Sequence, residues 1–219
     1  MLITYHGHSC FKLKGKNGTV ITDPYSGVGF EMPSMSGDIV TVSHDRYDHN
    51  NYHDVTGTAR RPKPFVIEHL GEYEVGGISV FGYKSFHDGE AGEKAGINRI
   101  YVIVIDGLRV CHLGDLGHEL DENTLNEIGD VDVLLLPTGG IYTINSKQAV
   151  AVAKALEPSF VVPMHYKTSA HDQSKFGELQ GLDEFVKEFG AENVEQIDKL
   201  KVEKDRLPEE KELVILQRT

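Results

Sequence analysis

One short loop concentrates metal-binding side chains directly after an apolar, strand-like run. Residues 43–50 carry two imidazoles and two carboxylates within six residues, and they follow the run Ile-Val-Thr-Val at residues 39–42. A loop that leaves the end of a strand can turn several such groups toward one point, and imidazole nitrogen and carboxylate oxygen are ligands that zinc accepts. Because three or four ligands are needed, the rest of the chain must complete the site. The alternative is a polar loop whose acids and histidines only cap the next helix.

Matching polar residues follow three later apolar runs. His87, Asp115 and His165 each stand at or just beyond the end of a predicted strand. Because α/β architectures gather ligands at the carboxyl ends of strands, we expect these side chains to meet the histidine-rich loop. Earlier in the chain, His8 follows the first predicted strand and Asp23 the third. We expect Asp23 to accept a hydrogen bond from a ligand imidazole, and His8 either to face the site or to form a turn.

Length, composition and charge exclude several classes of protein. With 219 residues and 39% hydrophobic side chains, the chain can bury a substantial core, and we expect one domain over residues 1–219. The 34 acidic residues outnumber the 22 basic ones and give a formal charge of -12, which repels phosphate backbones, so nucleic acid is not an expected partner. Cys10 and Cys111 lie in apolar runs and are predicted to be reduced core residues. No apolar run approaches the roughly 20 residues that cross a bilayer, so we expect a cytoplasmic protein that does not bind membranes.

The hydrophobic pattern changes half-way along the chain. Short strands dominate the first half, and strands alternate with helices in the second. Predicted strands cover residues 2–5, 10–13, 19–22, 39–42, 65–67, 78–86, 99–105, 108–111, 131–136, 160–162 and 213–216. Predicted helices cover residues 120–128, 146–156 and 182–189, with Ser146 as the N-cap of the second and Gly190 ending the third. Residues 168–181 are predicted to form a polar, mobile flap in which His171 is solvated.

The sequence around the candidate ligands resembles that of a known family. The matching words are Gly-His-Ser-Cys-Phe at residues 7–11, His-Leu-Gly-Asp-Leu-Gly-His at 112–118, Pro-Thr-Gly-Gly-Ile-Tyr-Thr at 137–143 and Pro-Met-His-Tyr-Lys-Thr at 163–168. With residues 44–49, they resemble the metallo-β-lactamase fold superfamily, whose signature is His-x-His-x-Asp-His, and in it the small metal-dependent hydrolases related to ascorbate-6-phosphate lactonases. The resemblance implies an α/β (α+β) fold, the four-layer αβ/βα sandwich of two mixed sheets face to face with helices outside.

The same resemblance implies a site for one or two zinc ions, with manganese or nickel as alternatives. The implied ligands are His44 and His87 for the first ion, Asp48, His49 and His165 for the second, and Asp115 as a bridge between them. A metal-bound water loses a proton near neutral pH, and the resulting hydroxide attacks a carbonyl carbon or a phosphorus that the metal polarises. The implied activity is hydrolysis of a small ester, lactone, amide or phosphoester.

One position departs from the signature of the superfamily. Arg46 stands where the second histidine is expected, and a guanidinium has no lone pair to give to a metal. If the Arg46 side chain pointed in the direction of that histidine, its charge would lie roughly 4 Å from the first ion. The repulsion at an effective dielectric constant near 20 would then be on the order of 8 kcal/mol. Since a structural zinc site contributes roughly 10–16 kcal/mol, the first position is predicted to be empty or weak. One ion is then expected on Asp48, His49, Asp115 and His165.

Arg46 and His8 leave several outcomes open. Arg46 could swing outward to pair with Asp45 or another acid, or His8 could supply the missing imidazole. Arg46 could also be an exposed side chain in a permissive loop, or it could bind a carboxylate or phosphate of an anionic small-molecule substrate. The candidate catalytic residues are thus Asp48 and Asp115, chiefly as ligands, Arg46, and His8. A proton shuttle could be His8, His44 or His87, and the sequence does not choose among them. The rival function is a non-catalytic metal- or ligand-binding protein that kept the fold.

Overall fold

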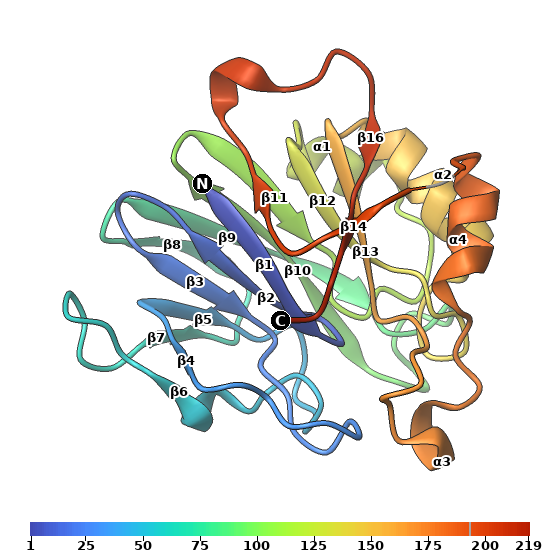
Figure 1. The fold of residues 1–219 in the computed structure, drawn as a ribbon, viewed down its shortest axis with the longest axis horizontal. Helices are drawn as coiled ribbons and strands as arrows, with labels where there is room; N and C mark the ends of the chain where they lie inside the picture. The colour runs from blue at the N-terminus through green and yellow to red at the C-terminus, as the bar shows by residue number, and fades with distance from the viewer. Residues whose placement is uncertain (193) are drawn as a thin grey trace.

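Two β-sheets packed face to face form the centre of the molecule (Figure 1). The computed structural model describes residues 1–192 and 194–219. Over these residues, the first sheet has six strands in the order β15-β1-β2-β3-β5-β7 and mixes antiparallel with parallel pairs. Its strands are β1 (Leu2–Gly7), β2 (Cys10–Lys14), β3 (Thr19–Thr22), β5 (Ile39–Thr41), β7 (Phe65–Ile67) and β15 (Leu200–Lys201).

The second sheet has seven strands within the same described ranges, in the order β16-β13-β12-β11-β10-β9-β8. They are β8 (Gly71–Val75), β9 (Ile78–Phe86), β10 (Ile97–Ile105), β11 (Leu108–His112), β12 (Val133–Pro137), β13 (Phe160–Met164) and β16 (Glu212–Leu213). The sequence pattern did not predict β8, because its Gly-Glu-Tyr-Glu-Val run has few apolar residues. Glu72 and Glu74 are exposed on this edge strand, where their charges oppose pairing with a second molecule.

The inner faces of the two sheets bury one hydrophobic core between them. Tyr5, Phe11 and Leu13 of β1 and β2 belong to the same buried cluster as Tyr101 of β10 and Val162 of β13. Full burial of such a side chain contributes roughly 1.5–3 kcal/mol relative to an exposed one. This core fixes the position of one sheet on the other, and therefore the distance between the loops at their common edge.

Different elements cover the outer faces of the two sheets. Three helices share a second apolar cluster with β10 and β12 on the outer face of the second sheet, and they are drawn together in Figure 1. On the first sheet, Cys10 and Ile21 pack with Tyr25 and Met35 from the connecting segments. The helices are α1 (Glu122–Ile128), α2 (Ser146–Leu156), α3 (Gln173–Phe176), α4 (Leu182–Phe189), and the 3-10 turns η1 (Tyr52–Asp54) and η2 (Lys204–Arg206). The remaining strands are β4 (Met35–Ser36), β6 (Val55–Thr56), β14 (Gln196–Ile197) and β17 (Ile215–Leu216).

The structure confirms the mixed α/β architecture of two facing sheets and corrects some details. The N-cap of α2 is Asn145 and not Ser146, because the Asn145 side chain accepts the N–H of Gln148 at 3.0 Å. The segment predicted to be a solvated flap contains α3, and its His171 is buried, not solvated. Helix α4 ends at Gly190 in the left-handed conformation, and both cysteines are free and buried, as predicted.

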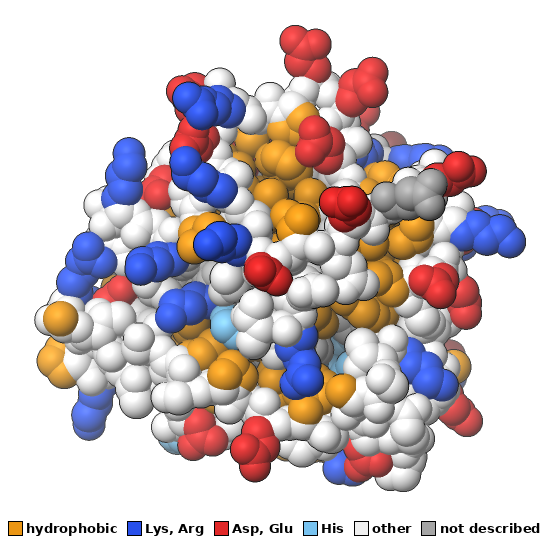
Figure 2. All heavy atoms as spheres, in the orientation of Figure 1, with side chains coloured by type: hydrophobic (Ala, Val, Ile, Leu, Met, Phe, Trp, Pro, Cys, Tyr) orange, Lys and Arg blue, Asp and Glu red, His pale blue; other side chains and the backbone are white. Residues whose placement is uncertain are grey.

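The charges of the chain are unevenly spread over its surface. Phe11 and Leu13 of β2 face the inter-sheet core, so the alternating Lys12 and Lys14 point outward. Figure 2 shows Lys and Arg side chains gathered over the N-terminal strands, on a protein whose formal charge is -12. Among the described helices, none combines the length and the hydropathy needed to cross a bilayer.

Replacement of Asn145 tests the corrected helix cap. Asn145→Ala should lower the free energy of unfolding by about 1 kcal/mol in urea titrations, because the first turn of α2 loses a hydrogen-bond acceptor. The neighbouring Ser146→Ala is the control: no residue of the described chain hydrogen-bonds its buried hydroxyl, so the change should stay below about 0.5 kcal/mol. A larger loss for Ser146→Ala than for Asn145→Ala would contradict this cap.

Candidate metal centre

The candidate site lies where the carboxyl ends of strands from both sheets meet. In the first sheet, β1, β3 and β5 run in the same direction, and β9, β11, β12 and β13 do so in the second. The loops that follow these strands therefore gather at one edge of the sandwich. Seven buried ligand candidates lie there: His8, His44, Asp48, His49, His87, Asp115 and His165.

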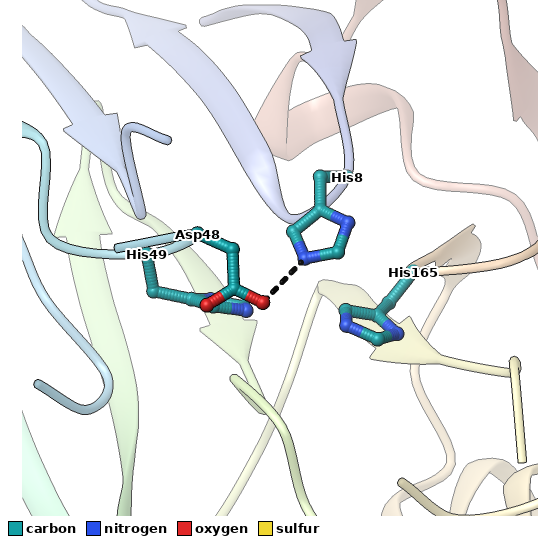
Figure 3. Close-up of side chains that lie close together, drawn as sticks. All are labelled: His8, Asp48, His49 and His165. Atoms are coloured by element: carbon teal, nitrogen blue, oxygen red, sulfur yellow. Dashed lines mark ion pairs between the residues drawn. The ribbon is translucent and has the colours of Figure 1, made fainter. Parts of the chain in front are cut away.

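These side chains form two groups, and in each group the potential ligand atoms lie within 4.8 Å of one another. The groups are His44, His87 and Asp115 in the first, and His8, Asp48, His49 and His165 in the second. Figure 3 shows the three imidazoles of the second group gathered around the Asp48 carboxylate. The structure thus brings the six predicted ligands together. It adds His8 to the second group, so His8 does not supply the missing imidazole of the first.

The Asp115 carboxylate connects the two groups. Its Oδ2 atom lies 3.2 Å from Nε2 of His49 and 3.2 Å from Nε2 of His87. The Nε2 atoms of His165 and His44 lie 3.4 Å and 3.8 Å from the same oxygen. One carboxylate oxygen therefore faces four imidazole nitrogens that come from three different loops.

The protonation of His49 indicates that these contacts are suited to metal ions. Nδ1 of His49 lies 2.8 Å from Asp23 Oδ2, and a carboxylate only accepts, so Nδ1 carries the proton. In a neutral ring, Nε2 then turns a lone pair toward Asp115. The Nε2 atoms of His44, His49 and His87 are buried and lack a hydrogen-bond partner among residues 1–192 and 194–219. Lone pairs that face a carboxylate without donors repel it unless a cation lies between them, so the donor set fits a metal such as zinc.

Asp23 orients the loop that carries most of the ligands. Its carboxylate accepts hydrogen bonds from the Ser43 N–H at 2.8 Å and from the Ser43 hydroxyl at 2.5 Å, besides the bond from His49. The Ser43 hydroxyl is also 3.0 Å from Nδ1 of His44. The structure therefore places Asp23 where the sequence predicted an acceptor for a ligand imidazole.

The backbone near several site residues is strained. His8, Asp23 and His165 have φ values of 55°, 38° and 53°, a region that side-chain-bearing residues seldom adopt. Close backbone packing also requires Gly139, where an added Cβ would lie 2.1 Å from the carbonyl oxygen of His165. Conformations this costly persist where the surrounding fold holds them, as it does at functional sites.

Burial and neighbouring charges set the protonation of the ligands. Burial lowers the pKa of His44 and of His165 to about 3, which leaves both rings neutral and able to bind metal. Burial alone would raise the pKa of Asp115, but His165 and His49 hold it well below its usual range. Burial likewise opposes the charged form of His49, yet Asp115 and Asp23 raise its pKa well above the usual value. The site therefore favours an added positive charge near Asp115.

Arg46 lies at the mouth of the site and not inside the first group. Its side chain is 46% exposed, and Nε is 3.8 Å from Asp48 Oδ1. Asp45 accepts a hydrogen bond from Asn50, and the ion-pair partner of Arg46 is Asp48 and not Asp45. Arg46 and Tyr142 border both a narrow cleft of about 200 Å³ and a wider one of about 440 Å³. The narrow cleft reaches Asp48, Asp115 and His165, and the wide one reaches His87.

Sequence reasoning missed two supports of the site. Asn98 accepts the N–H of Asp115 at 2.9 Å and donates to the Leu113 carbonyl at 2.8 Å, which fixes the Asp115 loop. Its signal was a polar residue directly before the strand predicted at residues 99–105. Phe176 of α3 is buried against the ring of His8, with 5.1 Å between ring centres. No local pattern links a residue of the polar segment to the first turn.

Residues 2–165 match the family model of the β-lactamase superfamily domain. The chain belongs to the β-lactamase superfamily. Two relatives named as metal-dependent hydrolases come from Korarchaeum cryptofilum, 30% identical over 85% of this chain and 89% of the relative, and Methanoregula boonei, 31% identical over 77% and 83%. A crystal structure assigned as a Zn-dependent hydrolase of the metallo-β-lactamase superfamily from Thermotoga maritima is similar with TM-score 0.80. It is 36% identical and covers 98% of this chain and 97% of its own. This superfamily member is a metal-dependent hydrolase of the metallo-β-lactamase fold.

Replacement of Asp23 tests its orienting role. Asp23→Asn should weaken binding of a divalent metal by about 10–100-fold. An amide has a single oxygen and cannot accept all the hydrogen bonds that the two carboxylate oxygens accept from Ser43 and His49. Competition titrations with a chelator measure this affinity. Asp45→Asn in the same loop is the control, since Asp45 is exposed and its carboxylate accepts a hydrogen bond from the Asn50 side chain. Equal metal affinities for the two variants would refute the role of Asp23.

Proposed function

We propose that this superfamily member is a zinc-dependent hydrolase that uses metal-activated water on a small ester, lactone, amide or phosphoester. The observation that carries the proposal is the set of four imidazole nitrogens within 3.2–3.8 Å of one buried Asp115 oxygen. Four buried imidazole nitrogens around one carboxylate oxygen are a donor set suited to metal binding. Manganese and nickel remain alternatives to zinc, since the same nitrogen and oxygen donors bind both.

The residues that would hold metal are divided between the two groups. His44 and His87 would hold a first ion, Asp48, His49 and His165 a second, and Asp115 would contact both. A bound ion would supply a water of lowered pKa and polarise the electrophile of the substrate. Asp23 keeps the proton of His49 on Nδ1, and Phe176 and Tyr47 line the narrow cleft and restrict the access of water.

We propose that Arg46 weakens the first position and binds an anionic group of the substrate. The support for weakening is that Arg46 lines the wide cleft together with His87, a ligand of the first position. Its half-exposed side chain also adjoins Asp48 and the narrow cleft. A guanidinium can bind a carboxylate or phosphate through two parallel hydrogen bonds. Clefts of about 200 and 440 Å³ suit a small molecule better than a polymer. The formal charge of -12 argues against nucleic acid as the substrate, and the location we propose for the enzyme is the cytoplasm.

Loss of the bridging carboxylate tests the hydrolase. On a panel of chromogenic esters, lactones and phosphodiesters with added zinc, manganese or nickel, Asp115→Ala should lower kcat/KM by at least about 100-fold. His165→Ala should do the same, because it removes a ligand of the second ion, as Asp115→Ala removes one that would contact both. His53→Ala, an exposed histidine outside the site, should keep the activity of the unmodified protein. Unchanged hydrolysis in Asp115→Ala would count decisively against the proposal.

Restoring the signature histidine tests the effect of Arg46 on the first position. Arg46→His should raise tightly held zinc from about one to about two ions per chain, because it replaces a repelling charge by a ligand. Arg46→Ala is the matched control: it removes the charge and supplies no ligand, so its metal content should lie between the two. Elemental analysis after dialysis measures the content. Two tightly held ions in the unmodified protein would contradict the weakening, and activity that appears only in Arg46→His would favour a non-catalytic protein.

A further inference from the structure

The turn between β1 and β2 directs the imidazole of His8 into the second ligand group. His8 has a left-handed backbone with φ 55°, uncommon outside glycine. Its carbonyl accepts hydrogen bonds from the Tyr5 hydroxyl and from the backbone N–H of His165, both at 2.9 Å. These bonds fix the turn against the end of β13, and the rings of His8 and His165 lie 4.1 Å apart between centres. The position of His8 is therefore built into the fold.

The ring of His8 is buried without hydrogen bonds. The residue is 0% exposed, and in the described parts of the chain neither of its ring nitrogens has a hydrogen-bond partner. Nε2 lies 3.5 Å from Asp48 Oδ2, and the rings of Phe176 and His171 pack against it with centres 5.1 Å and 5.6 Å away. A buried polar atom without a hydrogen bond is costly, and Nε2 reaches only ion-pair distance of Asp48. A metal ion between this nitrogen and the Asp48 carboxylate would bind both.

A proton shuttle does not explain this placement. A shuttle must exchange protons with the solvent or the substrate, yet His8 borders neither the narrow nor the wide cleft. His165, by contrast, lines the narrow cleft and His87 the wide one. His8 lies behind these residues, where a metal ligand is expected and a proton carrier is not.

The two groups differ in the number of protein ligands they offer. The second group has four, three imidazoles and one carboxylate, whereas the first has three. Structural zinc sites are closed by four protein ligands, and catalytic sites keep a position for water with three. The first group also borders the wide cleft through His87, beside Arg46.

We propose that His8 completes, with Asp48, His49 and His165, the ligands of a closed, tightly held structural ion, and that the exchangeable ion at His44, His87 and Asp115 is the one that serves hydrolysis. This inference rests on the proposed metal-dependent function and divides it between two unlike positions. The smaller number of protein ligands in the first group makes its ion the exchangeable one, so activity should depend on the supply of free metal.

Zinc content and affinity of two alanine variants test the division. Dialysed protein should retain one zinc, and His87→Ala should retain the same ion with unchanged affinity in chelator competition. His8→Ala should lose this ion on dialysis. Its zinc affinity should fall by at least about 10–100-fold, which is what the loss of a partner that only orients a ligand costs. His53→Ala is the surface control. Wild-type affinity in His8→Ala, or loss of the tight ion in His87→Ala, would overturn the proposal.

A spectroscopic test needs no variant and covers the case in which His8→Ala fails to fold. Zinc is added to metal-free protein while long-range ¹H–¹⁵N spectra record the imidazole nitrogens. The first equivalent should shift three rings, those of His8, His49 and His165, and the second equivalent should shift those of His44 and His87. A first equivalent that shifts only two rings, or that shifts His44 and His87, would overturn the assignment.

Activity separates this inference from the proposed function. Hydrolysis by dialysed protein with one zinc should be at least about 10-fold lower than after added zinc, and His87→Ala should not respond to the addition. If no substrate is hydrolysed at any zinc level while the His8 results hold, the proposed function fails and the closed site stands. Full hydrolysis with a single ion that depends on His8 would instead refute the division of roles and keep the hydrolase.

Discussion

The buried carboxylate of Asp115, surrounded by imidazole nitrogens, is the interaction on which the architecture of the site depends. Its Oδ2 atom faces nitrogens from the loop after β5, the end of β9 and the end of β13. Each of these loops must be held in position for the nitrogens to meet at one oxygen. The fold does so with the inter-sheet core, the Asn98 amide and the Asp23 carboxylate. The site is thus prepared before any ion binds.

The two candidate metal positions differ in their surroundings. Arg46 brings a permanent positive charge to the mouth, and His8 adds an imidazole on the opposite, buried side. Arg46 contacts Asp48 of the group that His8 joins, and it also borders the wide cleft beside His87. Under the division of roles proposed above, the four-ligand group would hold a structural ion and the three-ligand group would leave room for water.

The segment at residues 168–181 forms part of this preparation. His171 and Phe176 pack against His8, and the Tyr142 hydroxyl donates to the Lys175 carbonyl at 3.1 Å. The segment was predicted to be solvated because its composition is polar. Its few apolar side chains are the ones that turn inward, and composition averaged over fourteen residues conceals them. The same averaging concealed β8, whose glutamates face solvent.

The sequence alone determined the sheet-rich first half, the alternating second half and the placement of six ligand candidates at strand ends. Strand periodicity and residue chemistry are local properties, and both are legible in one chain. Only the tertiary structure decided that His8 joins Asp48 and His165, that Asn98 holds the Asp115 loop, and that Arg46 contacts Asp48 and not Asp45. Those contacts join residues far apart in the chain, or depend on which way a long side chain turns. Their geometry follows from how two sheets pack, a property that no segment of sequence carries by itself.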